Sequence, residues 1–161
     1  GGGAILTEIH ELDLLHKMFG QPKRLWCSGG KLSSLNMDVE DTVSVLLEYE
    51  IDSRVLPATV NMSFVQRPNT RTINLWGETG SIKWDFMRGR LSLSNENEEV
   101  ETIYDNPSFE RNEMFLSELG HFIHCVKSGE EPETSLEKVI GGHFVALKMK
   151  ESLDEKRIVF V

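Results

Sequence analysis

Positive charge, cysteine and long apolar runs are all scarce in this 161-residue sequence. Its 17 Lys and Arg residues are outnumbered by 26 Asp and Glu residues, and the resulting net charge of −9 disfavours binding to nucleic acid. No stretch approaches the roughly 18 consecutive apolar residues that a membrane span needs. The two cysteines, Cys27 and Cys125, lie in apolar surroundings without a CxxC pair, which predicts free thiols in a reducing cytoplasm.

The remaining composition is that of an ordinary globular protein. Hydrophobic residues make up 39% and charged residues 27%, and the length is sufficient for one hydrophobic core. With no linker-like segment visible, we predict a single domain over residues 1–161. The chain opens on Gly1 without a methionine and runs at once into a helical pattern. We therefore expect the native N-terminus, with any segment before it, to be missing.

Apolar residues at helical spacing predict three helices, over residues 6–19, 109–127 and 135–153. Gly20 and Pro22 are placed to end the first of these helices. Thr134 and Glu137 fit a capping box at the start of the last one. Each glycine of the pair at 141–142 costs that helix about 1 kcal/mol relative to alanine. Close packing against the sheet or a neighbouring helix is the expected compensation.

Between and after these helices, alternating apolar residues predict strands, over residues 23–30, 41–51, 59–66, 70–77, 81–86, 91–94, 100–104 and 157–161. Their short connections favour antiparallel neighbours. The predicted class is α+β, with helices packed on one face of a large, open, mostly antiparallel sheet. Not all of its large apolar side chains can point inward, so we expect the open face to bind a second copy of the chain, giving a homo-oligomer. The side chains in question are those of Leu46, Met62, Phe64, Leu75, Trp76 and Trp84.

Three stretches resemble the C-terminal domain of the Gfo/Idh/MocA oxidoreductases, the relatives of glucose–fructose oxidoreductase and inositol dehydrogenase. They are residues 1–15 (GGGAILTEIHELDLL), residues 77–82 (GETGSI) and the closing helices between residues 112 and 152. The family pattern for the first stretch is three glycines, an apolar run, an aspartate, a histidine, and an aspartate three residues later. Thr7 stands here where the family often has the first aspartate.

The resemblance implies a dihydrodipicolinate-reductase-like C-terminal domain that binds substrate and forms oligomers. The family carries an N-terminal Rossmann domain that binds NAD or NADP, and its substrates are mostly sugars, polyols or nucleotide sugars. A lysine of that domain and the histidine of the C-terminal motif work at the reacting carbinol. Because this chain lacks the Rossmann domain, we expect it to need that partner and to be inactive alone.

His10 is the predicted catalytic residue. Oxidising a carbinol by hydride transfer requires a base for the hydroxyl proton, and imidazole can act in both directions near neutral pH. His10 lies off the apolar stripe of its predicted helix, where an ordinary surface histidine is the alternative. Thr7 and Asp13, spaced i−3 and i+3 from it, are predicted to bind substrate. Threonine cannot compensate an imidazolium, and the sequence leaves open whether Glu8 or Glu11 supplies that charge.

Four further residues complete the predicted site. Gly2 and Gly3 are expected to let the backbone approach the cofactor closely. Arg67 and Arg71 suit a carboxylate or phosphate on the substrate, although salt bridging on an acidic surface is an alternative reading.

No metal site is assigned from the sequence. The i, i+3, i+4 spacing of His121, His124 and Cys125 would suit a metal, but it falls on an apolar helix with no further ligand. Two alternatives to an active enzyme remain. One is a retired family member that only dimerises or binds sugar, which Thr7 favours; the other is an unrelated α+β ligand-binding domain.

Overall fold

The computed structural model describes residues 2–161. The predicted α+β class is confirmed, and the strands form two four-stranded sheets in which every pair is antiparallel. The chain divides into two compact units. Unit 1 combines Gly1–Val65 with Glu133–Val161, and unit 2 comprises Gln66–Pro132. That residues 1–161 act as one domain stays a prediction.

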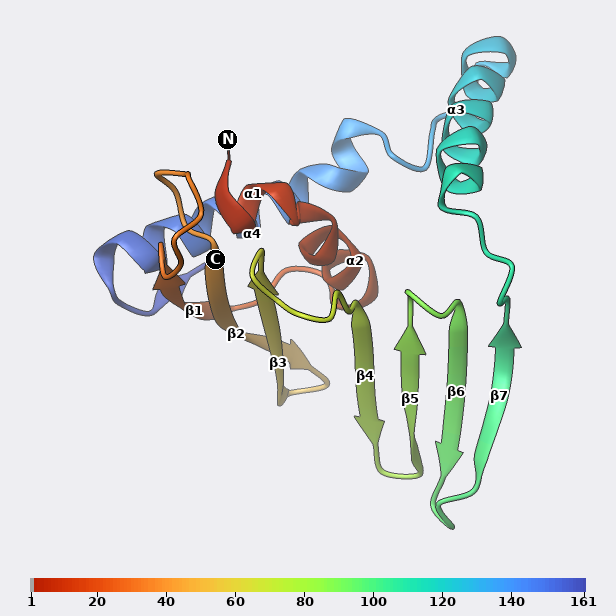
Figure 1. The fold of residues 1–161 in the computed structure, drawn as a ribbon, viewed down its shortest axis with the longest axis horizontal. Helices are drawn as coiled ribbons and strands as arrows, with labels where there is room; N and C mark the ends of the chain where they lie inside the picture. Colours follow the sequence, from red (N-terminus) through yellow and green to blue (C-terminus); the bar gives the residue numbers. More distant parts are fainter. Residues whose placement is uncertain (1) are drawn as a thin grey trace. The chain divides into compact units, whose positions relative to one another are not determined.

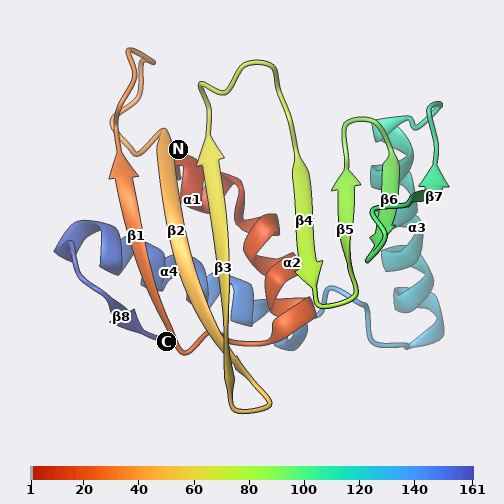
Figure 2. The same cartoon turned by 90° about the horizontal axis from the view of Figure 1, so that it is seen from below.

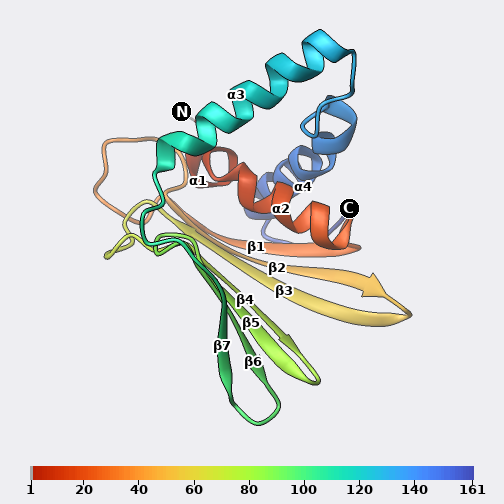
Figure 3. The ribbon, with the colours of Figure 1, turned by 90° about the vertical axis from the view of Figure 1, so that its right-hand side faces the viewer.

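Unit 1 is a sheet of strand order β3-β2-β1-β8 with helices on one face. Figure 1 shows β1, β2 and β3 side by side, Figure 2 also shows β8 beside β1, and Figure 3 shows the helices of unit 1 gathered on one side of the sheet. In chain order, the elements are α1 (Gly3–Thr7), α2 (Ile9–Phe19), β1 (Arg24–Gly30), β2 (Thr42–Ile51), β3 (Arg54–Ser63), α4 (Leu136–Glu155) and β8 (Val159–Phe160).

The alternation in β2 decides which face of this sheet is covered. Val43, Val45 and Leu47 are buried, whereas Ser44 and Leu46 between them are exposed. Successive strand residues point to opposite faces, so the buried set faces the helices. The core is completed from the helices and neighbouring strands by residues that include Ile5, Leu12, Leu25, Met62, Val145 and Met149.

Two adjacent glycines let α2 and α4 pack closely, as predicted. A Cβ at Gly141 would lie 2.2 Å from the ring of His16, and one at Gly142 would lie 2.9 Å from the Cα of Asp13. Both distances are shorter than real Cβ contacts. The helix-propensity cost of these glycines is therefore offset by the approach of the neighbouring helix.

The first helix differs from its prediction. The helical run begins at Gly3 rather than near Leu6, and Glu8 divides it into α1 and α2. At the break Glu8 has φ −96° and ψ 26°, and the Glu11 N–H donates to the Glu8 carbonyl across a tight i→i+3 turn. No glycine or proline marks this position, so the apolar periodicity continues through it and conceals the break.

The predicted cap of the last helix and the predicted start of β3 were also wrong. The predicted Thr134 capping box does not form, because Ser135 occupies the N-cap position and no side chain caps the helix. Strand β3 begins at Arg54, five residues before the predicted start. Asp52 and Ser53, with φ values of 50° and 61°, make a tight β2–β3 turn although neither is glycine.

Unit 2 is a meander of strand order β4-β5-β6-β7 followed by a helix. Its elements are β4 (Thr72–Gly77), β5 (Gly80–Asp85), β6 (Arg90–Asn95), β7 (Val100–Asp105) and α3 (Arg111–Ser128). The predicted turn between β4 and β5 is confirmed by the pairing of Gly77 with Gly80. Helix α3 exposes large apolar side chains, those of Met114, Phe115, Leu116, Leu119, Phe122, Ile123 and Val126. Such a face is typical of an interaction surface. Within residues 2–161, no helix is long and apolar enough to cross a membrane.

Candidate functional site

The opening glycines pack against a buried carboxylate. Gly3 is buried with φ +70°, and a Cβ there would lie 2.3 Å from a carboxylate oxygen of Glu40. A Cβ on the half-buried Gly2 would lie 2.8 Å from the Cβ of Leu6. Local packing thus accounts for glycine at both positions, and Gly1 lies outside the described residues. The cofactor contact expected of Gly2 and Gly3 stays a prediction.

Glu40, which the sequence analysis did not single out, holds the start of α1 in place. Its side chain is only 4% exposed and lies 2.8 Å from the Nζ of Lys150 on α4. Its Oε1 accepts a hydrogen bond from the Ile5 N–H at 3.3 Å, and its carbonyl accepts one from the Ala4 N–H at 2.9 Å. A buried charge needs such partners, so Glu40 ties the start of α1 to α4, and α1 is the helix that leads into α2 and His10.

The neighbouring Asp41 fixes the loop between β1 and β2. Its carboxylate is fully buried and accepts hydrogen bonds from the N–H groups of Leu32 and Ser33 at 3.1 and 2.9 Å. The Ser33 hydroxyl donates to it at 2.6 Å. The hydrogen bond from this hydroxyl, together with those from the backbone, holds the pKa of Asp41 well below its usual range. This carboxylate therefore acts as a structural anchor.

Cys27 lies in the core near Glu40 and Lys150. Burial raises the pKa of its thiol to about 11, with a further rise from the charge of Glu40 that Lys150 opposes. The thiol therefore stays protonated near neutral pH, and Cys27 is an inert core residue and not a nucleophile.

His10 is exposed and meets two carboxylates at one ring nitrogen. Its side chain is 49% exposed, and its Nε2 lies 3.3 Å from Oε2 of Glu8 and 3.2 Å from Oε1 of Glu11. On a continuous helix, residues one or two positions apart do not face each other. The break at Glu8 changes the direction of the helix and accounts for the approach of the Glu8 carboxylate, whereas Glu11 directly follows His10 within α2. Both glutamates that the sequence left open are thus present beside the ring.

Thr7 and Asp13 lie on the same two helices but in different surroundings. Thr7 is exposed at the end of α1, so its hydroxyl is available to a ligand. Asp13 is half-buried in α2, with its backbone against Gly142 of α4. Because the helix breaks between Thr7 and Ile9, the three predicted residues do not share the face of one straight helix. Their substrate-binding roles stay predictions.

Arg67 and Arg71 belong to unit 2. The guanidinium carbon of Arg71 lies 4.4 Å from the centroid of the Phe86 ring and 6.0 Å from that of Trp84. Arg67 is exposed, and its Nη1 donates to the Gln66 carbonyl at 2.8 Å. Stacking on aromatic rings gives Arg71 a structural role, and its contact with substrate stays a prediction.

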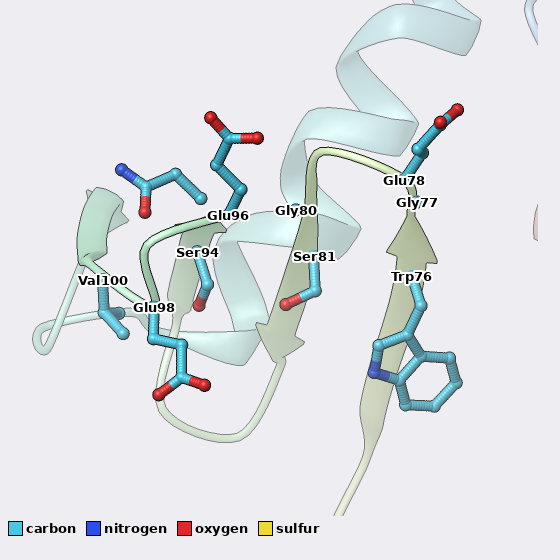
Figure 4. Close-up of a pocket in the computed structure, with 10 residues that line it drawn as sticks. Trp76, Gly77, Glu78, Gly80, Ser81, Ser94, Glu96, Glu98 and Val100 are labelled. Atoms are coloured by element: carbon cyan, nitrogen blue, oxygen red, sulfur yellow. The ribbon is translucent and has the colours of Figure 1, made fainter.

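A cavity of about 470 Å³ lies at one end of the unit 2 sheet. Figure 4 shows Trp76, Ser81 and Ser94 on three neighbouring strands, with Glu96 and Glu98 from the β6–β7 turn. The Trp76 side chain is 81% exposed. None of the residues predicted from sequence to form the site lines this cavity.

Two groups of side chains have spacing that could suit a metal. Ligand atoms of Glu8, His10 and Glu11 lie within 4.8 Å of one another. Two carboxylates beside an exposed histidine also form an ordinary ion-pair cluster, and we interpret them so. On α3, Sγ of Cys125 lies 3.6 Å from Nε2 of His121, whereas His124 pairs with Glu130 at 3.5 Å. His124 is thus directed to an acidic partner beyond the helix.

Residues 1–83, just over half of the chain, match the GFO/IDH/MocA C-terminal domain. The chain belongs to the GFO/IDH/MocA family. The resemblance inferred from the glycine-rich turn is confirmed, and an unrelated α+β ligand-binding domain is excluded. No protein of curated function is similar enough in sequence to count as a relative.

Solved structures share the GFO/IDH/MocA fold. An oxidoreductase from Agrobacterium radiobacter, in complex with NAD+, L-tartaric acid and magnesium, superposes with a TM-score of 0.77 at 20% identity over 95% of this chain. UDP-N-acetylglucosamine 3-dehydrogenase GnnA from Acidithiobacillus ferrooxidans superposes with a TM-score of 0.75 at 16% sequence identity over 91% of this chain. Levoglucosan dehydrogenase, in complex with NADH and levoglucosan, superposes with a TM-score of 0.77 at 15% sequence identity over 96% of this chain.

The match covers this chain but only part of each relative. It covers 47% of the A. radiobacter oxidoreductase, 45% of GnnA and 48% of levoglucosan dehydrogenase. This chain therefore spans about half the length of these relatives, and it corresponds to the C-terminal domain that the family match identifies. At these identities the similarity establishes the fold.

Proposed function

We propose that this chain is the substrate-binding and oligomerising domain of an NAD(P)-dependent oxidoreductase that acts on a sugar, polyol or nucleotide sugar. Its family and the ligands named for two similar structures, NAD+ with tartaric acid and NADH with levoglucosan, support this. The observation that carries the proposal is His10, an exposed imidazole in the first turn of α2, directly after the glycine-rich start of the domain.

The proposed chemistry divides between two parts of the full-length protein. A nicotinamide cofactor, bound mainly by an N-terminal Rossmann domain outside this chain, supplies the hydride acceptor or donor. In the oxidising direction His10 takes the carbinol proton, and in the reducing direction it returns that proton to the carbonyl oxygen. Partial exposure of the ring leaves it reachable by a substrate while α2 holds its position.

Substrate orientation is assigned to the exposed Thr7 hydroxyl, to Asp13, and to Arg67 and Arg71. A hydroxyl suits a sugar hydroxyl, and a guanidinium suits the carboxylate or phosphate of an acidic or nucleotide-linked sugar. Of the two glycines proposed to approach the cofactor, Gly3 is buried against Glu40 and Gly2 is half-buried and partly accessible. This agrees with a cofactor bound mostly elsewhere.

The open face of the unit 1 sheet is the proposed surface for a second copy of the chain. Trp26 and Leu46, paired across β1 and β2, are 49% and 38% exposed on the face opposite the helices. Burying these neighbouring side chains against their symmetry mates would remove apolar surface from water. Sedimentation of the full-length protein should show an oligomer. We expect Trp26→Lys to weaken this oligomer, and Ser28→Lys, two residues along the same strand, to weaken it less. Equal sedimentation of wild type and Trp26→Lys would place the interface elsewhere.

The activity itself is tested by a substrate screen. Full-length protein is mixed with NAD+ or NADP+ and with sugars, polyols and nucleotide sugars, while nicotinamide absorbance is followed. We expect turnover with at least one sugar-like alcohol and none from residues 1–161 alone. Lack of turnover together with sugar binding would favour the retired, dimerising or sugar-binding member that Thr7 suggests. Turnover by the isolated chain would contradict the division of labour.

A further inference from the structure

The contacts of His10 are unevenly distributed over the two nitrogens of its ring. Both carboxylates lie at the same ring nitrogen, Nε2, at 3.2 and 3.3 Å. Within residues 2–161, the other ring nitrogen, Nδ1, has no ion pair or hydrogen bond. The ring is therefore contacted asymmetrically, with its acidic partners gathered on one side.

A carboxylate oxygen can only accept a hydrogen bond, and an unprotonated ring nitrogen can also only accept one. Two carboxylates this close to a bare Nε2 lone pair would repel it. The arrangement is favourable when Nε2 carries the proton, because the positive end of the N–H dipole then lies beside both negative oxygens. In the neutral ring this leaves the lone pair on Nδ1.

We propose that Glu8 and Glu11 are positioning residues that hold the His10 ring proton on Nε2, so that Nδ1 exchanges the proton with the substrate hydroxyl. The inference rests on the proposed function of His10. During oxidation the O–H proton would move to Nδ1, the O–H electron pair would become part of the C=O bond, and the carbinol hydrogen would leave as hydride to the nicotinamide. The resulting imidazolium would face two negative charges, which a neutral Thr7 cannot provide.

The break between α1 and α2 places Glu8 in this arrangement. Glu8 occupies the junction as C-cap of one helix and N-cap of the next, and the Glu11 N–H donates to the Glu8 carbonyl at 3.0 Å. The backbone that places one carboxylate thus also places the other. The backbone of Asp13 lies where α2 packs against Gly142, and the ion pairs of the ring involve Glu8 and Glu11.

The test is the tautomer of His10 in the 161-residue chain, read from long-range proton–nitrogen NMR correlations of histidine-labelled protein. The measurement is made on the neutral form of the ring. We expect the Nε2–H form in the wild type. In the variant Glu8→Gln with Glu11→Gln, the tautomer ratio should shift toward Nδ1–H by about twofold to fivefold, the range for exposed ion pairs. Each single variant should give part of that shift, and Glu137→Gln, an exposed glutamate on α4, should give none.

Three results would overturn the inference. The first is a wild-type ring protonated at Nδ1, and the second is an unchanged tautomer ratio in the double variant. The third is movement of the Nε2 resonance when Zn²⁺ or Mg²⁺ alone is added, which would make Nε2 a metal ligand. In the full-length enzyme the double variant should lower kcat about tenfold with little change in KM.

The proposed function and the positioning role can be refuted separately. A His10 variant of normal activity would remove the proposed function but leave the tautomer result intact, whereas an unchanged tautomer would remove only the positioning role.

Discussion

Ser152, near the end of α4, is predicted to contribute more to stability than its single hydroxyl suggests. The side chain is fully buried, its Oγ accepts the Cys27 N–H at 2.9 Å, and its hydroxyl donates to the Arg157 carbonyl at 2.6 Å. Strand β8 pairs with β1 only at Arg24 and Leu25, so the Cys27 N–H beyond it has no strand partner on that side. The hydroxyl takes the place of the missing strand.

The loss of unfolding free energy expected for Ser152→Ala follows from these two hydrogen bonds. Losing an intramolecular hydrogen bond costs about 1 kcal/mol, and leaving a buried N–H unsatisfied costs about 1–3 kcal/mol. Arg157 follows α4 and is exposed, so we expect water to reach its carbonyl and the larger penalty to apply to Cys27 alone. We expect a total loss of about 2–4 kcal/mol in the free energy of unfolding. That is a large share of the roughly 5–15 kcal/mol by which typical proteins are stable.

Urea unfolding measures this loss, with Trp26 as the reporter. The chain has three tryptophans, and replacing Trp76 and Trp84 of unit 2 by phenylalanine leaves Trp26 as the only one, on strand β1 of unit 1. Ser28→Ala is the matched control, because Ser28 is exposed on the same strand, and its effect should stay within about 0.5 kcal/mol. A loss below about 1 kcal/mol for Ser152→Ala would refute the reasoning.

Three further predictions concern packing and titration. Gly142→Ala should lower the unfolding free energy by about 1–3 kcal/mol, since its Cβ would meet the Asp13 backbone. Gly120→Ala, on α3 with nothing within 4 Å, should raise it by about 0.5–1 kcal/mol, and equal effects in calorimetry would contradict the packing argument. Because the folded pKa of Asp41 lies below its ordinary 3.8, its stabilisation is present above that pH and is lost as the pH falls. Asp41→Asn should therefore cost about 1–3 kcal/mol near neutral pH and flatten the acid side of the stability profile; an unchanged profile would argue against it. Cys27, with its pKa near 11, should be alkylated by iodoacetamide at least about a hundredfold more slowly than free cysteine, by mass spectrometry; rapid labelling would show that it is not buried.

Much of the fold is readable from the sequence because its signals are local. Period-two alternation identified β2, and Gly77 with Gly80 identified the β4–β5 turn. The glycines at 141–142 indicated a close packing contact of the last helix, although the sequence did not identify the neighbouring element. The early start of β3 was missed because Asp52 and Ser53 make a left-handed turn that is usual for glycine.

The site was harder to predict because its geometry depends on residues distant in sequence. Glu40 lies 35 residues from Ile5 and 110 from Lys150 in sequence, yet these contacts fix the start of α1, the helix that precedes α2 and His10. The helix break at Glu8 has no sequence signal, so spacing on an ideal helix directed attention to Thr7 and Asp13. The sequence left open whether Glu8 or Glu11 supplies a charge to His10, and the structure places both carboxylates beside the ring.

The proton-transfer role of His10 is tested most directly by steady-state kinetics of the full-length protein with its best sugar or polyol substrate. His10→Ala should lower kcat by at least about a hundredfold, the usual worth of a general acid–base group. His143→Ala, an exposed histidine on α4, should leave kcat unchanged. A His10→Ala enzyme that turns over at close to the wild-type rate would contradict the account.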